Sequence, residues 1–212
     1  MQNLGKFITF EGVDGAGKTV QVERTKNFLI QKGIKTIAIR EPGSTEIGEK
    51  IRNLILENEM SAISETLMFF AARAELVQQI ITPSLQEGTW VICDRFYDST
   101  LVYQGVLKNF DIEKIMQLKF LTIGDLEPDL TIILNLSPEI SAKRVAKRTS
   151  HETNSEKNKF DDMQLSYYKK ISESYEKIAD IFDYRAEIIN ANKSEEKVSE
   201  SIKKILIDKF QI

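Results

Sequence analysis

The chain has 212 residues, of which 42% are hydrophobic and 29% are charged, and this length favours one α/β domain over two. A net charge of −3 argues against a protein that wraps around nucleic acid, and no apolar run is long enough to span a bilayer. The first residues lack the pattern of a secretory signal, and the single cysteine, Cys93, cannot form an internal disulfide. We therefore expect a cytoplasmic protein without a nucleic-acid or membrane partner.

Five short, almost continuously apolar runs are typical of strands that are buried on both faces of a sheet. They are Lys6–Phe10, Ile34–Ile39, Thr89–Cys93, Leu130–Leu136 and Ala186–Ile189. Longer stretches favour helices at Lys18–Gln31, Ile47–Glu57, Ser64–Leu85, Asp111–Ile123, Pro138–Arg148, Phe160–Phe182 and Ser194–Lys209. This alternation predicts a three-layer α/β/α fold with a five-stranded parallel sheet, formed by a single domain over residues 1–212.

The segment GVDGAGKT, which starts at Gly12, fits the P-loop pattern G-x-x-x-x-G-K-[ST]; it directly follows one predicted strand and opens a predicted helix. Its glycines let backbone N–H groups surround phosphates, and the helix N-terminus adds partial positive charge. Lys18 is then expected to reach the β- and γ-phosphates of ATP, and Thr19 to ligate Mg²⁺. A glycine-rich turn that matches by chance is the alternative. The predicted ATP-binding residues are Gly12, Val13, Asp14, Gly15, Ala16, Gly17, Lys18 and Thr19.

Another predicted strand, TWVIC, leads directly into Asp94 and Arg95. An aspartate at a strand end often only forms a turn or caps a helix, so Asp94 alone leaves both interpretations open. Arg95 favours a functional role, because ligands of open α/β sheets bind at the carboxyl ends of the strands. There the carboxylate of Asp94 can hold Mg²⁺ through water or organise the phosphates, while the guanidinium of Arg95 binds a phosphate.

Five blocks, in order across roughly the first 140 residues, resemble the bacterial type of the thymidylate kinase family: EGVDGAGKT, REPGSTEIG, LMFFAARAELV, TWVICDRFYDSTLVYQG and PDLTIILNLSPE. The resemblance implies a P-loop kinase that uses ATP and Mg²⁺ to phosphorylate dTMP to dTDP, in dTTP synthesis for DNA replication. It also implies a homodimer formed by helix packing. The apolar stripe in Ser64–Leu85 or in Asp111–Ile123 could serve as the interface, or could equally be buried core.

The resemblance also implies which residues bind dTMP. Phe69 would stack on the thymine ring and Arg73, one helical turn later, would hydrogen-bond a base carbonyl. The alternative for Phe69 is an ordinary core aromatic, as one of Phe69 and Phe70 is expected to be. By the same resemblance, Arg95 and Arg40 would bind the acceptor phosphate, and Thr100 and Gln104 would approach the base. Tyr103 would crowd the sugar 2′ position, and Asp14 would contact the 3′-hydroxyl side or the metal. For Tyr103 and Thr100, the alternative is a packing role.

The polar stretch Thr149–Lys159 contains no apolar residue, and the resemblance implies a mobile lid over about residues 144–160. Relatives without an arginine in the P-loop usually supply one from an Asp-Arg-x-Glu stretch in the lid, and this chain has no such stretch. We expect Arg148, with Arg144 beside it, to act instead; a solvated basic helix face is the alternative. His151 is expected to take no part. The predicted catalytic residues are Lys18, Asp94, Arg95 and Arg148, with Thr19 and Asp94 at the metal.

Two other functions compete with this interpretation. A P-loop kinase for a different nucleotide or nucleoside would share the phosphate chemistry and differ around the base. A GTP-driven switch would need an Asp-x-x-Gly element and an Asn-Lys-x-Asp guanine reader. Here Asp94 is followed by Arg-Phe-Tyr, which does not match the first element. The segment Asn-Lys-Ser-Glu, which starts at Asn192, ends in glutamate where the guanine reader has aspartate. The residues therefore favour a kinase.

Overall fold

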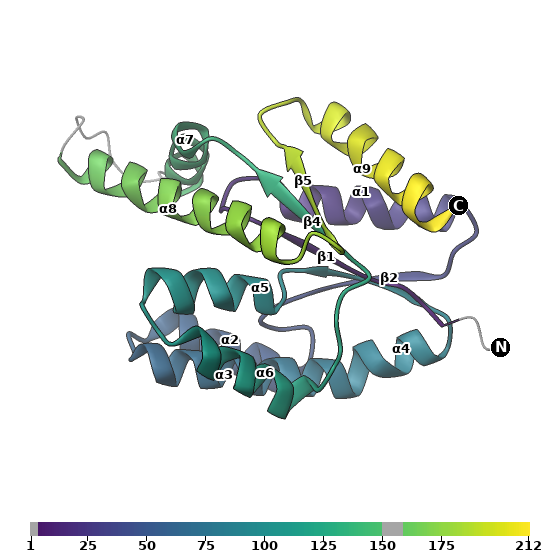
Figure 1. Ribbon diagram of the computed structural model, residues 1–212, viewed down its shortest axis with the longest axis horizontal. Helices are drawn as coiled ribbons and strands as arrows, with labels where there is room; N and C mark the ends of the chain where they lie inside the picture. The colour runs from purple at the N-terminus through teal and green to yellow at the C-terminus, as the bar shows by residue number, and fades with distance from the viewer. Residues whose placement is uncertain (1–3, 150–158) are drawn as a thin grey trace.

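The computed structural model describes residues 4–149 and 159–212, without the side chains of residues 148, 149 and 159–164. A five-stranded parallel sheet with the order β2-β3-β1-β4-β5 lies at its centre (Figure 1). The strands are β1 (Phe7–Gly12), β2 (Thr36–Arg40), β3 (Trp90–Asp94), β4 (Leu130–Asn135) and β5 (Ala186–Asn190). All five predicted strands are confirmed, with bounds that shift by at most two residues.

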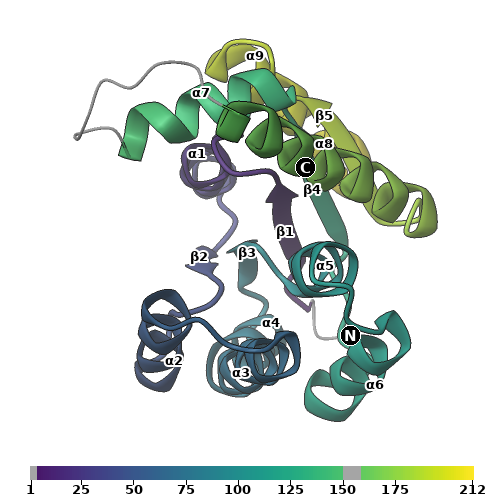
Figure 2. The same ribbon diagram turned by 90° about the vertical axis from the view of Figure 1, so that its left-hand side faces the viewer.

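Helices cover both faces of the sheet, so the predicted α/β/α layering is confirmed (Figures 1 and 2). One face carries α1 (Lys18–Gln31) and α9 (Glu195–Phe210). The other side holds α2 (Glu46–Glu57), α3 (Ala62–Leu76), α4 (Thr82–Gln86), α5 (Tyr97–Thr100), α6 (Ile112–Ile123) and α8 (Lys159–Ile181). Helix α7 (Pro138–Thr149) lies beside α8.

Two π-helical segments depart from the sequence prediction. The predicted helix Ser64–Leu85 is a continuous helical path in which η1 (Val77–Ile81) separates α3 from α4. A second helical path, α5 followed by η2 (Leu101–Leu107), was not predicted at all. Its sequence, YDSTLVYQGVL, contains three β-branched residues and one glycine, which have low helix propensity. Burial of Tyr97, Thr100 and Val102 outweighs that propensity, because these side chains pack beneath the sheet.

The central strands explain why the apolar runs fold as they do. Every residue of β1 is buried, and β4 is buried over its first five residues, as both faces of the sheet are covered. One polar pair crosses this core, where Thr9 and Thr131 share a hydrogen bond of 2.8 Å between neighbouring strands. The hydroxyls of these two threonines thus have partners. Among the described residues, no helix combines the length and apolar character needed to cross a membrane.

The carboxyl edge of the sheet gathers the chemistry-bearing residues. β1 ends at Gly12, whose φ of 127° is poorly accessible to other residues and turns the chain into the glycine loop. β2 ends at Arg40 and β3 ends at Asp94, which lie side by side in the parallel register. Because β1 sits between β3 and β4, the loops after β1 and β3 open at the point where ligands bind in such sheets.

Candidate active site

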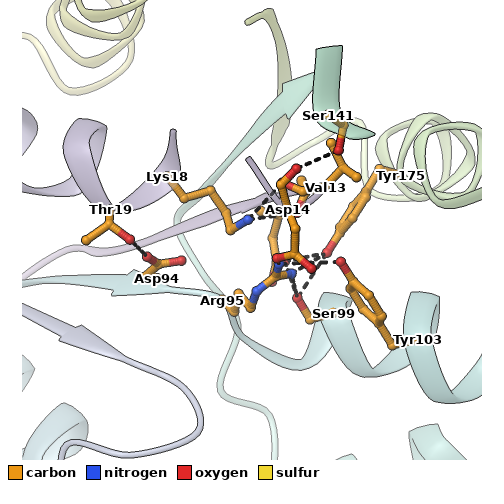
Figure 3. A network of polar contacts seen from close by, with 12 residues as sticks. Val13, Asp14, Lys18, Thr19, Asp94, Arg95, Ser99, Tyr103, Ser141 and Tyr175 are labelled. Atoms are coloured by element: carbon orange, nitrogen blue, oxygen red, sulfur yellow. Dashed lines mark hydrogen bonds and ion pairs between the residues drawn. The ribbon is translucent and has the colours of Figure 1, made fainter. Parts of the chain in front are cut away.

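The glycine loop and the strand next to it meet through the two residues predicted to hold the metal. The Thr19 hydroxyl, in the first turn of α1, donates to Asp94 Oδ2 at 2.8 Å (Figure 3). Lys18 Nζ donates to the carbonyl oxygens of Gly12 and Val13, each at 3.0 Å. A cavity of about 450 Å³ opens here, lined by the loop and by both strand ends. These residues place an ammonium, a hydroxyl and a carboxylate in the lining of one cavity.

Burial affects the charge of the P-loop lysine. Lys18 is almost fully buried, and this desolvation lowers the pKa of its ammonium to about 7 against the attraction of Asp94 and Asp14. The nearby Arg95 guanidinium lowers the pKa further. An anionic phosphate beside Lys18 would favour the charged form, so a phosphate ligand and the proton of Lys18 should bind together.

Arg95 is the hub of the polar network in Figure 3. Its φ of 72° is unusual for a residue other than glycine and aims the side chain back across the sheet edge. Its Nη2 donates to Asp14 Oδ1 at 2.7 Å and to the Tyr103 hydroxyl at 3.4 Å, while Nη1 donates to Ser99 at 3.0 Å and Tyr175 at 3.2 Å. Burial raises the pKa of both tyrosines, so their hydroxyls stay protonated. The guanidinium is therefore held from several sides.

A fully buried carboxylate, Glu11, supports this hub from below. It accepts hydrogen bonds from the Phe96 backbone N–H at 2.7 Å, from Ser99 at 2.6 Å and from Tyr175 at 3.0 Å. Burial, reinforced by Asp98, raises the Glu11 pKa to about 7. Sequence reasoning missed Glu11, although an acid inside the apolar strand FITFEG was a usable signal. It missed Tyr175 because the residue resembles any buried position of an amphipathic helix.

A second cavity, of about 540 Å³, lies on the other side of Arg95 and has the size of a small-ligand site. Phe69 lines it, whereas Phe70 is buried in the core, so the two neighbouring aromatics have different roles. The other predicted dTMP-binding residues that line this cavity are Asp14, Arg73, Arg95, Thr100, Tyr103 and Gln104.

Arg73 is buried at the base of the second cavity. Its guanidinium binds Glu41 through Nε at 2.8 Å and donates from Nη2 to the Thr100 hydroxyl at 3.2 Å. The remaining nitrogen, Nη1, is buried and has no hydrogen-bond partner within the described part of the chain. A buried donor without a partner is costly, so a carbonyl oxygen of a bound ligand is the group that fits there.

The two cavities share four lining residues, namely Asp14, Glu41, Arg52 and Arg95. Arg52, on α2, was not predicted, since a single arginine on a helix gives no signal in the sequence. Its pKa is lowered by burial and by the nearby Arg40 and Arg95, which shows that three cations converge at this junction. Arg40 lines only the first cavity and is tied to Glu49 at 2.9 Å. The wall that the two cavities share is therefore suited to bind an anion that faces both of them.

The predicted lid lies in part outside the described residues, which exclude 150–158 with His151 and the side chain of Arg148. The role of Arg148 stays a prediction. Arg144, on α7, lines the first cavity and donates to the Gly15 carbonyl oxygen at 3.0 Å. Ser141 on the same helix donates to the Asp14 carbonyl oxygen at 2.6 Å. Helix α7 thus holds the glycine loop directly.

The residues at the first cavity fit Mg²⁺ together with a nucleotide. Within the described ranges no group of three or more His, Cys, Asp or Glu side chains could hold a metal by itself. Thr19 and Asp94 offer one hydroxyl and one carboxylate. Mg²⁺ is usually bound by one or two carboxylates, substrate phosphates and waters, so this small donor set suits a metal that arrives with a triphosphate.

The strand, the glycine loop and α1, with Asp94 and Arg95 at the end of β3, have the arrangement that is typical of a P-loop nucleotide-binding protein. The second cavity beyond Arg95 gives such a protein room for another ligand next to the phosphates.

Comparisons with known proteins identify the family. The family model described as thymidylate kinase matches residues 10–202, and the chain belongs to this family. It is 39% identical over 209 residues to a thymidylate kinase of Orientia tsutsugamushi (strain Ikeda), a match that covers 99% of this chain and 96% of the relative. It is 43% identical over 178 residues to a thymidylate kinase of Prosthecochloris aestuarii, covering 82% and 80% of the two chains. A crystal structure of thymidylate kinase from Ehrlichia chaffeensis superimposes with a TM-score of 0.78 at 34% identity and covers 95% of this chain and 98% of that one.

Proposed function

We propose that the chain transfers the γ-phosphoryl group of ATP to dTMP and so forms dTDP for dTTP synthesis. The observation that carries this proposal is the pair of adjoining cavities with Arg95 and Arg52 in the wall between them. One cavity contains the P-loop and suits the ATP phosphates. The other has an aromatic wall at Phe69 and, at Arg73 Nη1, a donor without a partner among the described residues, which suit a nucleobase.

The acceptor oxygen of dTMP already belongs to a phosphate, so the reaction needs no strong base. The protein has to align two anionic phosphates and neutralise the charge that gathers between them. Lys18 and the loop amides bind the donor side, and Arg95 with Arg52 binds the acceptor phosphate. Thr19 and Asp94 would hold the Mg²⁺ that arrives with ATP, and the metal would supply further charge neutralisation. Arg144 and Arg148 on α7 add positive charge on the donor side.

The lining of the second cavity supports the remaining dTMP contacts of the proposal. Phe69 stacks on thymine, Thr100 and Gln104 approach its edge, and Tyr103 lies where it crowds a sugar 2′-hydroxyl. Asp14 holds Arg95 at 2.7 Å and faces both cavities. Arg40 supports the acceptor phosphate indirectly, beside Arg52.

We also propose that the chain is one domain that works as a homodimer in the cytoplasm. Large apolar side chains are exposed on the neighbouring helices α2, α3 and α6, which lie together on the same side of the molecule in Figure 2. The most exposed are Leu121 (79%), Leu56 (66%) and Phe120 (65%). Exposed apolar patches of this kind often mark interfaces. No nucleic acid or membrane is proposed as a partner.

A coupled ADP-release assay with ATP and Mg²⁺ tests the proposal. dTMP is compared with dUMP, dCMP, AMP, GMP and thymidine at equal concentration. We expect fast turnover with dTMP, slow turnover with the other monophosphates and none with thymidine, which lacks the accepting phosphate. Preference for another acceptor would refute the assignment of the base cavity. ADP release that no acceptor increases would refute the kinase itself.

A further inference from the structure

Glu65 lines the second cavity and binds Gln104 and Lys108, two contacts that the family resemblance does not imply. It lies on α3, one helical turn before Phe69, and its side chain is only 13% exposed. Its Oε1 accepts a hydrogen bond of 2.9 Å from Gln104 Nε2, and its Oε2 pairs with the ammonium of Lys108. All of these residues line the same cavity.

The contact with Glu65 determines how the Gln104 amide is oriented. An amide has one donating and one accepting end, and side-chain packing alone does not distinguish them. A carboxylate can only accept, so only the NH₂ end of Gln104 can face Glu65; the opposite orientation would bring two acceptor oxygens together. Lys108 occupies the other carboxylate oxygen, which leaves Oε1 for Gln104. Gln104 therefore offers its carbonyl oxygen, an acceptor, to a ligand in the cavity.

This acceptor lies in the same wall as a donor. Arg73 Nη1 has no partner among the described residues, and its neighbour Nη2 is held by Thr100, one turn before Gln104. A donor and an acceptor that line one cavity can be complementary to a base edge that carries a carbonyl next to an N–H. Thymine and uracil have this edge in O4 and N3–H. Cytosine has the reverse, an NH₂ group next to a bare ring nitrogen, and would face donor with donor and acceptor with acceptor.

We propose that Glu65 is a positioning residue that makes this kinase reject cytosine, because it fixes the Gln104 amide with its oxygen toward the base. The proposal rests on the proposed function, since it assumes that the second cavity binds a pyrimidine monophosphate. Glu65 acts only through Gln104 and does not touch the reacting phosphates. It reads the hydrogen-bonding edge of the base and is indifferent to the thymine methyl group.

Three acceptors separate this role from a structural one. In Glu65→Gln, the new side chain can donate or accept, so both orientations of Gln104 become possible at nearly unchanged volume. We expect the ratio of kcat/KM for dTMP over dCMP to fall about tenfold, as one matched contact is replaced by one that suits either base. The ratio for dTMP over dUMP should stay unchanged, because these bases share the edge.

Two further variants complete the test. Glu65→Asp keeps acceptor-only chemistry and should retain the preference for dTMP over dCMP; Lys108→Met removes the ion pair but not the contact with Gln104, and should retain it too. Melting temperatures verify that each variant is folded. An unchanged dTMP/dCMP ratio in Glu65→Gln, or a parallel fall of the dTMP/dUMP ratio, would overturn the proposal. If wild-type protein rejected dTMP, the proposed function would fail first and this inference with it.

Discussion

At the level of single residues, the site depends on one guanidinium that is fixed before any ligand binds. Arg95 has a left-handed backbone conformation and is held by Asp14, Ser99, Tyr103 and Tyr175. A cation that is already oriented needs little rearrangement when charge develops on a phosphate, and such preorganisation is a large source of catalytic stabilisation. This arrangement requires a carboxylate beneath Arg95 to be buried away from water, which is energetically unfavourable.

That carboxylate, Glu11, gives the protein a testable pH dependence. Its pKa in the folded state is about 7, above the ordinary 4.5, chiefly because of burial. Between these values the folded state binds more protons than the unfolded state, so stability is lost as pH rises through the window. In Glu11→Gln this loss should disappear, which makes the free energy of unfolding less dependent on pH by on the order of 2 kcal/mol.

Urea denaturation of wild type and Glu11→Gln at about pH 5 and pH 7 measures this difference. The range avoids Lys18, whose lowered pKa acts above about pH 7 and with the opposite sign. Equal pH slopes for the two proteins would show that Glu11 titrates normally in the folded state.

At the level of elements, one buried ion pair ties the start of β5 to α5. Arg185 binds Asp98 through two hydrogen bonds of 2.8 Å, and both side chains are at most 1% exposed. Arg185 also donates to the Tyr97 hydroxyl at 2.8 Å. This pair fixes the helix that begins two residues after Arg95, and so positions Ser99 and Thr100 for the site.

Removing one partner should be strongly destabilising, since it leaves the other charge buried and uncompensated. We expect Arg185→Met to lower the free energy of unfolding by about 3–5 kcal/mol. Lys50→Met, which removes an exposed pair with Glu46 on α2, should cost about 0.3–0.5 kcal/mol. Urea titrations compare the two variants, and losses of similar size would contradict the role of the buried pair.

The sequence predicted those elements whose pattern is local. Continuous apolar runs located all five strands, and the glycine motif located the loop between β1 and α1. The helical path Tyr97–Leu107 escaped prediction because its residues favour other structures and only tertiary burial makes it helical. Arg52, Glu65 and Tyr175 escaped for a related reason. Each reaches the site from a helix whose pattern is ordinary, and only the fold shows which of its faces meets Arg95 or Gln104.

At the level of the whole molecule, two adjoining cavities at the carboxyl edge of one sheet explain why such a small chain can bind two nucleotides. The side formed by α2, α3 and α6 lies apart from the glycine loop in Figure 2 and carries the interface that we propose. Of its exposed apolar side chains, Leu56 also lines the second cavity, whereas Phe120 and Leu121 line neither of the two cavities.

Light scattering after size exclusion tests the proposed homodimer. Wild-type protein should have twice the chain mass of 24.3 kDa. Phe120→Lys should shift the protein toward the monomer, because a charge buried in an apolar interface is costly. Ile181→Lys, which changes an equally exposed residue on α8, is the matched control and should remain dimeric. A monomeric wild type, or a dimer that Phe120→Lys leaves intact, would contradict the proposed interface.

The most direct test of the account follows the labelled γ-phosphoryl group of ATP into dTMP, with dTDP and ADP separated and quantified. Wild-type protein should form both products in equal amounts. Lys18→Ala should lower this rate by on the order of a hundredfold or more, whereas Lys26→Ala, which changes a half-buried lysine of the same helix, should not. Label that stays on ATP or appears only as free phosphate, or near-normal transfer by Lys18→Ala, would contradict phosphoryl transfer at this site.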